Sequence, residues 1–116
     1  MYVRGVRGAT TVKHNKKAEI IEATEELLSE IVKQNEIKVA DIAAVIFSVT
    51  QDLNAEFPAV AARAMGWTET PLMCSNEIAV PGSLAKCLRI LLLLNTTKKA
   101  SKIKHVYLRE AVNLRR

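Results

Sequence analysis

Residues 16–34, KKAEIIEATEELLSEIVKQ, decide the fold because they predict one long amphipathic helix. Apolar side chains recur there at helical spacing, at Ile20, Ile21, Leu27, Leu28, Ile31 and Val32. Glutamates and a lysine occupy the opposite side of the predicted helix. Asn15, directly before the stretch, is a candidate N-cap residue. A helix with a single apolar stripe packs that stripe against another layer of structure. We therefore expect the segments before and after it in the sequence to form strands of a sheet.

The segments that flank this helix predict the first two strands of the sheet. Tyr2–Val12 precedes the helix, and Gly5 and Gly8 within it allow close approach of another backbone. Alternation places Val3, Gly5 and Arg7 on one face of this strand and Arg4 and Val6 on the other. After a polar connection at Lys38–Asp41, the apolar run Ile42–Val49 predicts a second, largely buried strand.

The second half of the chain predicts one short helix and three more strands. Pro58 opens the helix Ala59–Met65, since proline is tolerated in a first turn, and Gly66 ends it. The expected strands are Pro71–Ser75, Lys86–Asn95 and His105–Leu108. The run at 86–95 is also compatible with a helix, but the turn residues on both sides favour a strand. The predicted fold is α/β (α+β), a mixed five-stranded sheet with one long and one short helix packed on it.

Length and composition indicate one globular domain, residues 1–116, with a flexible tail from about residue 110. The 17 Lys and Arg against 12 Asp and Glu favour an anionic partner, which could be nucleic acid, a membrane surface or an acidic metabolite. The few aromatic residues are scattered, which disfavours base stacking on nucleic acid. Apolar runs such as Ile90–Leu94 are far shorter than the ~20 residues that span a membrane. We therefore expect neither nucleic acid nor a membrane as partner.

The cysteines and histidines are few and widely spaced. Cys74, Cys87, His14 and His105 form no CxxC or related pattern, which disfavours a zinc or iron–sulfur site. The two thiols could form one disulfide, but the N-terminus lacks the apolar segment of a secretory signal. We therefore expect a cytoplasmic protein without a metal.

Arg89 is the most informative single residue. It lies between Leu88 and Ile90 within an apolar run, and an isolated cation is costly to bury. One interpretation is a structural ion pair, or a head group that reaches solvent past its apolar stem. The other is that the partner is an anionic ligand, because a guanidinium matches a carboxylate with two parallel hydrogen bonds. Local sequence leaves both interpretations open and favours the structural one.

Other candidate residues carry weaker signals. Arg7 lies between two glycines that permit close approach, although the pattern is not a nucleotide-binding GxGxxG, and it could equally be a solvated arginine on a strand. Glu77 follows a predicted strand, a common place for site residues and for ordinary loops alike. Cys74 is interpreted as a packing residue or weak donor, and Tyr107 as a half-buried strand aromatic. These residues alone indicate a basic domain with a candidate anion site.

Six short motifs occur in order along the chain: Arg4-Gly5-Val6-Arg7-Gly8-Ala9-Thr10-Thr11, Phe57-Pro58-Ala59, Gly66-Trp67, Cys74 with Glu77, Lys86-Cys87-Leu88-Arg89, and His105-Val106-Tyr107-Leu108. This collinear set resembles the monofunctional chorismate mutases of the homotrimeric, pseudo-α/β-barrel class, over essentially the whole chain. The resemblance implies an isomerase that converts chorismate to prephenate by an intramolecular Claisen rearrangement, in phenylalanine and tyrosine biosynthesis. It also implies no cofactor, and active sites at the subunit interfaces of a homotrimer.

The resemblance further implies a role for each matching residue, with Arg89, Glu77 and Arg7 as the catalytic set. Arg89 would contact the ether oxygen, which gains negative charge as the C–O bond breaks, while Arg7 and Tyr107 would hold the enolpyruvyl carboxylate. Glu77 with Cys74 would engage the ring hydroxyl. The remaining expected substrate contacts are Ser75 and Asn76, then Phe57, Ala59, Arg63 and Met73 from the neighbouring subunit, and Arg115 from the tail.

Two departures from the family pattern affect these expectations. Position 60 is Val60 where the family carries a lysine, which leaves Arg63 as the expected contact of the ring carboxylate. The sequence ends at Arg116, before the longer tail of some members, which questions a lid role for the tail but not the chemistry. The alternatives are a non-catalytic, metabolite-binding regulatory trimer and, less favoured, a basic nucleic-acid-binding module.

Overall fold

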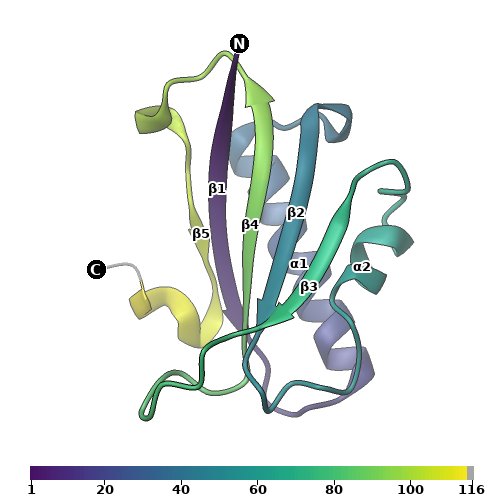
Figure 1. The fold of residues 1–116 in the computed structure, drawn as a ribbon, viewed down its shortest axis with the longest axis vertical. Helices are drawn as coiled ribbons and strands as arrows, with labels where there is room; N and C mark the ends of the chain where they lie inside the picture. Colours follow the sequence, from purple (N-terminus) through teal and green to yellow (C-terminus); the bar gives the residue numbers. More distant parts are fainter. Residues whose placement is uncertain (115–116) are drawn as a thin grey trace.

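The computed structural model describes residues 1–114, and in it a five-stranded sheet carries its two α-helices on one face (Figure 1). The strands are β1 (Tyr2–Thr11), β2 (Ile42–Val49), β3 (Leu72–Asn76), β4 (Cys87–Thr96) and β5 (Val106–Tyr107). The helices are α1 (Lys17–Asn35), α2 (Ala59–Ala64) and the short 3₁₀ helices η1 (Val39–Asp41), η2 (Ala100–Lys102) and η3 (Arg109–Leu114). The strand order is β3-β2-β4-β1-β5.

The sheet is mixed, as the sequence predicts. The central strand β4 runs antiparallel to both β1 and β2, whereas the two edge strands, β3 and β5, run parallel to their neighbours. The apolar run of β4 forms a strand and not a helix, because both of its edges are paired and its side chains alternate between the two faces. The ambiguity that periodicity left there is thus resolved in favour of the strand.

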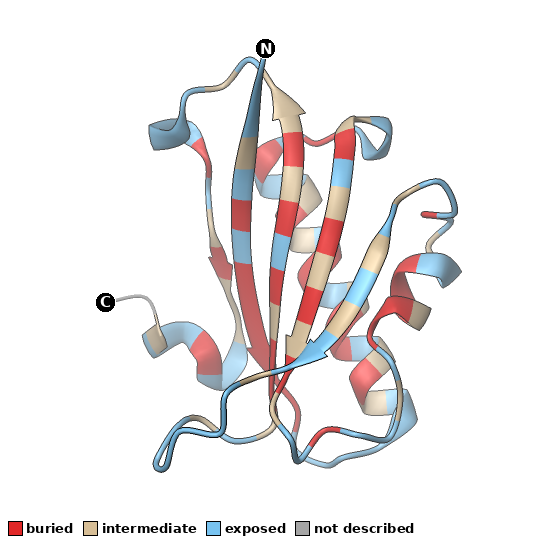
Figure 2. Ribbon diagram, in the orientation of Figure 1, coloured by how far each residue is buried: buried red, intermediate tan, exposed pale blue. Residues whose placement is uncertain are grey.

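The core lies between α1 and the rear face of the sheet. Leu27, Leu28 and Ile31 of α1 are fully buried against residues such as Val6 of β1, and Figure 2 shows the resulting alternation of buried and exposed positions along the strands. Gly8 is required at the closest approach of helix and strand. A Cβ atom there would lie 2.8 Å from Cδ1 of Ile31.

The prediction that Asn15 caps the long helix is wrong. Lys16 occupies the N-cap position without a side-chain cap, and α1 begins at Lys17. The Asn15 side chain instead accepts hydrogen bonds from the backbone N–H groups of Asn54 and Ala55, each at 3.0 Å. These amides belong to a loop, and their hydrogen bonds to the Asn15 amide oxygen replace the helix cap that the sequence predicts.

The C-terminal part of the described chain is more ordered than the sequence predicts. The tail expected from about residue 110 instead continues η3 to Leu114, and Ala111 is fully buried in a small second cluster with Ala9 and Cys87. The predicted strand 105–108 is reduced to Val106–Tyr107. This short strand and η3 form one edge of the sheet (Figure 1).

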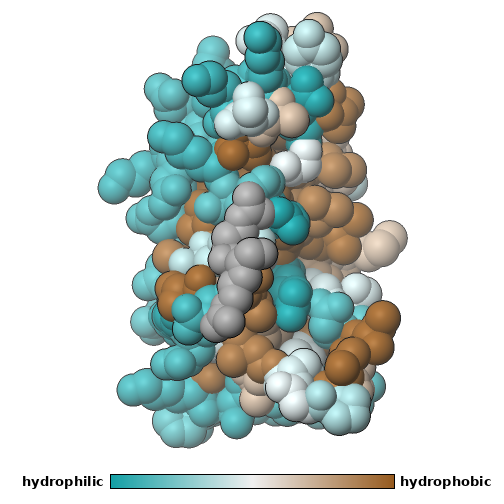
Figure 3. Space-filling view, turned by 90° about the vertical axis from the view of Figure 1, so that its left-hand side faces the viewer, coloured by the Kyte–Doolittle hydropathy of each residue, from teal (hydrophilic) through white to brown (hydrophobic). Residues whose placement is uncertain are grey.

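Neither α1 nor α2 covers the front face of the sheet, and within residues 1–114 only η3 packs on it, against Ala9 and Cys87. Val3 of β1 is 60% exposed and Met73 of β3 is 63% exposed, with Leu91 of β4 between them at 38%. In the side view of Figure 3, hydrophobic residues gather at the right, on the face turned to the viewer in Figure 1, while the helix side at the left is mostly hydrophilic. An apolar open sheet face of this kind is typical of an interaction surface.

Candidate active site

Strand register places three of the predicted site residues on the open face of the sheet. Arg89 lies opposite Ala9 of β1 on one side and Ser48 of β2 on the other, and Ala9 in turn lies opposite Tyr107 of β5. Arg7, two residues before Ala9, points to the same face. Arg7, Arg89 and Tyr107 accordingly line one cavity of about 290 Å³.

The Arg89 side chain combines both interpretations that the sequence leaves open. Its Nε lies 3.3 Å from Oε2 of Glu77, the distance of an ion pair, but this Nε is buried and forms no hydrogen bond with residues 1–114. Ser48 donates its hydroxyl to the same carboxylate oxygen at 3.2 Å. Glu77 is thus held beside Arg89 while a buried donor stays unsatisfied, and such a donor carries an energetic penalty that a ligand acceptor would remove.

The five arginines of the described chain fall into two groups. The guanidinium of Arg4 donates to the carbonyl oxygen of Lys98, and that of Arg109 donates to the carbonyl oxygen of Thr11, each at 3.1 Å. No protein oxygen within residues 1–114 accepts a hydrogen bond from the other three, which are Arg7, Arg63 and Arg89. These three are the arginines expected to contact substrate, and their unused donors suit an anion with carboxylate groups.

Cys87 lies behind Arg89 and is not a nucleophile. Burial raises the pKa of the Cys87 thiol, although the positive charge of Arg89 acts in the opposite direction. A thiol with a raised pKa stays protonated at neutral pH and is unreactive. Cys74 and Cys87 are both free, so the disulfide that the sequence permits does not form.

Several other residues predicted to contact substrate lie away from Arg89 in this chain. Phe57, Cys74, Ser75 and Asn76 line a second cavity of about 300 Å³. Cys74 packs partly against the main core, because it lies opposite Phe47 on the helix side of the sheet. The single chain therefore separates Cys74 from the cavity of Arg89.

The remaining predicted contacts occupy different surroundings. Arg63 lines a third cavity, with Trp67 and Leu72, and Met73 lies on the open sheet face. Ala59 is only 3% exposed and packs in the core, so its methyl group faces the interior of this chain. Arg115 lies outside the described residues.

Ser48 and Leu114 are residues of the Arg89 cavity that the sequence analysis missed. Ser48 had a detectable signal, since it is the single polar residue of the strand Ile42–Val49 and a hydroxyl in such a strand needs a partner. Leu114 had none, because its position depends on how η3 folds back beside β5.

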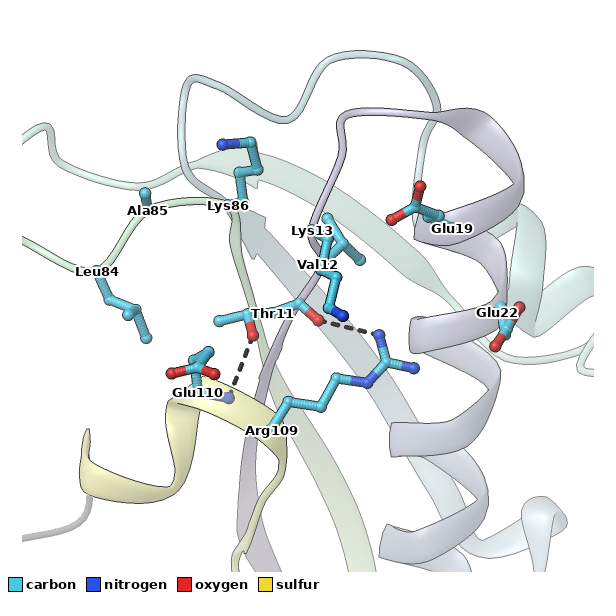
Figure 4. Close-up of a pocket in the computed structure, with 10 residues that line it drawn as sticks. All are labelled: Thr11, Val12, Lys13, Glu19, Glu22, Leu84, Ala85, Lys86, Arg109 and Glu110. Atoms are coloured by element: carbon cyan, nitrogen blue, oxygen red, sulfur yellow. Dashed lines mark hydrogen bonds between the residues drawn. The ribbon is translucent and has the colours of Figure 1, made fainter.

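A larger cavity, about 580 Å³, contains none of the predicted residues (Figure 4). It lies between the first turns of α1 and the start of η3. Two of its charged groups have partners in the chain, since Arg109 pairs with Glu26 at 3.3 Å and Glu19 pairs with His14 at 2.9 Å. Its size exceeds that of the Arg89 cavity, but the arginine that lines it, Arg109, already donates to the carbonyl oxygen of Thr11.

No group of three metal-ligating side chains, His, Cys, Asp or Glu, gathers within residues 1–114. No helix in this part of the chain is long and apolar enough to cross a membrane.

Comparison with known proteins identifies the family. A family model described as chorismate mutase type I matches residues 3–116. A chorismate mutase of Thermus thermophilus is 48% identical over 114 residues, 97% of this chain and 93% of that protein. One from Bacillus subtilis (strain 168) is 41% identical over 116 residues, 99% of this chain and 91% of that protein. A solved chorismate mutase structure from Clostridium thermocellum has a TM-score of 0.91 and 54% identity, covering 92% of this chain and 96% of that one. The chain belongs to the type I chorismate mutase family.

Proposed function

We propose that this protein is an isomerase that converts chorismate to prephenate at a site formed by the Arg89 cavity of one chain and the Phe57 and Arg63 surfaces of a neighbouring copy. The observation that carries the proposal is the set of three arginines with unused donors, of which Arg89 has its Nε buried in the wall of a cavity. A substrate with two carboxylates and a breaking ether bond supplies the acceptors that these donors lack.

The rearrangement breaks one C–O bond and forms one C–C bond within the same molecule, so it needs no nucleophile. Negative charge grows on the ether oxygen as the bond breaks, and we propose that Arg89 donates a hydrogen bond to it. One preorganised donor contributes about 3–4 kcal/mol to the transition state. Even a modest enzymatic acceleration requires about 8 kcal/mol. Arg89 therefore supplies at most about half, and the rest comes from holding a compact substrate conformer through Arg7, Glu77 and Tyr107.

The uncovered sheet face supports a homotrimer in which neighbouring copies complete each site. Val3, Met73 and Leu91 leave apolar surface in water in the single chain, and a partner would bury it. Phe57 is 65% exposed beside a separate cavity. Its exposed ring is available to close the Arg89 cavity of the next copy, which the single chain leaves open.

Charge and compartment are consistent with this assignment. The formal net charge of +5 favours a dianionic substrate. Since Val60 offers no cation, Arg63 is the side chain available in this segment for the second carboxylate. We infer a cytoplasmic location, which the two free cysteines support because thiols persist in reducing compartments.

The test follows loss of chorismate and appearance of prephenate with purified protein and no added cofactor. In the Arg89→Lys variant we expect kcat to fall about 10²–10³-fold, with a smaller change in KM, because the contact strengthens in the transition state. Arg4→Lys is the matched control. Arg4 lies on the same strand as Arg7 but on the opposite face, and it binds a backbone carbonyl.

Two outcomes would contradict the proposal. Binding of chorismate without turnover would instead favour a regulatory trimer that binds the metabolite. An equal effect of Arg89→Lys on kcat/KM and on substrate affinity, with kcat unchanged, would mean that Arg89 only anchors a carboxylate.

A further inference from the structure

The turn that follows β2 contacts the start of β4 just before Arg89. Thr50 and Asp52 belong to this turn, Cys87 is the first residue of β4, and Lys86 directly precedes it. Both carboxylate oxygens of Asp52 accept a hydrogen bond from the backbone N–H of Lys86, at 3.1 and 3.0 Å. Asp52 also accepts a hydrogen bond from the hydroxyl group of Thr50. Thr50 Oγ1 in turn accepts from the backbone N–H of Cys87 at 3.0 Å.

The backbone at Lys86 explains why these contacts are needed. Lys86 has φ of +46°, in the left-handed region that residues other than glycine rarely adopt. Two carboxylate oxygens directed at its N–H hold it in this conformation. We call Asp52, Thr50 and the N–H groups of Lys86 and Cys87 the Asp52 clamp.

The clamp lies where the two members of the Arg89–Glu77 pair are anchored. Arg89 follows Cys87 by two residues, and its strand neighbour Ser48 precedes Thr50 by two. Glu77 donates its backbone N–H to the carbonyl oxygen of Val49 at 2.8 Å. A shift of the β4 start against the β2 end would therefore displace Arg89 relative to Glu77.

We propose that Asp52 is a positioning residue, which acts through the left-handed turn at Lys86 to fix the Arg89 guanidinium at the ether oxygen. Asp52 does not line the Arg89 cavity, and its side-chain hydrogen bonds within residues 1–114 are to Thr50 and Lys86, neither of which is expected to bind substrate. The proposal rests on the proposed function for its kinetic consequence, but its structural consequence can be measured without turnover.

The first test is the Asp52→Ala variant. We expect kcat to fall about tenfold with KM changed less than about twofold, because misplacing a group that acts in the transition state affects kcat first. Asp41→Ala is the matched control, since the Asp41 side chain lies in η1, away from the clamp, and activity should be retained. An unchanged kcat in Asp52→Ala would overturn the proposal.

The second test adds Lys86→Gly to Asp52→Ala. Glycine adopts positive φ without a steric penalty, so the turn no longer depends on the clamp. We expect kcat to recover to within about threefold of the Lys86→Gly single variant. Failure to recover would show that Asp52 does not act through the turn at Lys86 and would overturn the proposal.

The third test asks whether Asp52 acts through Arg89. In an Arg89→Lys background, Asp52→Ala should change kcat less than about twofold, because effects on one functional unit are not additive. An equal tenfold loss in both backgrounds would contradict the proposal. If Asp52→Ala does not fold, as judged by circular dichroism, Asp52→Asn replaces it in the same set of variants. The asparagine side chain keeps one weaker acceptor, so we expect the same pattern of kcat changes with smaller magnitudes.

A measurement without substrate separates this proposal from the proposed function. In ¹⁵N-arginine-labelled protein, the Arg89 Nε–H resonance is assigned by its loss in Arg89→Lys. Its exchange with solvent should accelerate about tenfold in Asp52→Ala and be unchanged in Asp41→Ala. Unchanged exchange would overturn the positioning role even if the wild-type protein turns over chorismate. Accelerated exchange without turnover would support the clamp while refuting the function.

Discussion

At the scale of single residues, the use of each side chain depends on the partners that its own chain provides. Arg4 and Arg109 bind backbone carbonyls, so their donors serve the fold. Arg89 lies beside Glu77 but has a buried Nε without an aligned acceptor. The difference between a structural and a functional arginine therefore lies in unused hydrogen-bonding capacity and not in burial alone.

Gly8 provides a test of packing at the same scale. Replacement by alanine would place a Cβ atom 2.8 Å from Ile31 Cδ1 and 3.3 Å from the carbonyl oxygen of Val106, and the latter belongs to the backbone and cannot move away. We expect the free energy of unfolding to fall by about 1–3 kcal/mol. Urea denaturation measures it.

Gly5→Ala is the matched control for Gly8→Ala. Its Cβ would meet only the end of the Leu91 side chain, at 3.3 Å, on the open face of the sheet. The destabilisation should be clearly smaller than for Gly8→Ala. Equal losses in the two variants would contradict the assignment of Gly8 to the closest helix–sheet approach.

At the scale of elements, the central strand β4 determines the site. It pairs with both β1 and β2, so a single register brings Arg89 beside Ala9 and Ser48. The start of this register is fixed by the turn after β2, where Asp52 binds the Lys86 N–H. A displacement at this turn would shift β4 and with it Arg89.

The Asp52 clamp also predicts a pH dependence of stability. Partial burial tends to raise the pKa of Asp52, but hydrogen bonds from Thr50 and from the Lys86 N–H outweigh it, and the pKa lies below the ordinary value of 3.8. A carboxyl whose pKa is lower in the folded chain stabilises the fold above its unfolded-state pKa, and this contribution is lost as the pH falls through the folded-state pKa.

We therefore expect Asp52→Asn to lower the free energy of unfolding at pH 7, and the difference from wild type to shrink as the pH falls below about 4. Urea unfolding of both proteins between pH 7 and pH 3 measures this difference. A difference that stays constant over that range would show that the charge of Asp52 does not stabilise the turn.

At the scale of the whole molecule, sequence patterns predicted the sheet, the long helix and the strand assignment of residues 86–95. They did so because these elements have a strong periodicity or clear turn residues at their ends. The N-cap was misplaced because the loop at Asn54 competes for Asn15 across 39 positions, which no local pattern reveals.

The candidate site was only partly predictable for the same reason. Arg7, Arg89 and Tyr107 share a cavity because of strand register, a long-range property. The resemblance of short motifs predicts these residues as site residues, whereas local chemistry does not. Phe57 and Arg63 line other cavities of the chain, so the fold of a single copy does not bring them near Arg89.

The central claim, that each site combines the Arg89 half of one chain with the Arg63 half of another, is tested by mixing two inactive variants. Arg89→Lys and Arg63→Ala are unfolded together in equal amounts and refolded, with separately refolded samples combined afterwards as the control. In randomly mixed rings about one quarter of the sites would receive both intact halves, so chorismate turnover should rise to about a quarter of the wild-type rate. Turnover in the co-refolded mixture no higher than in the control would contradict the claim.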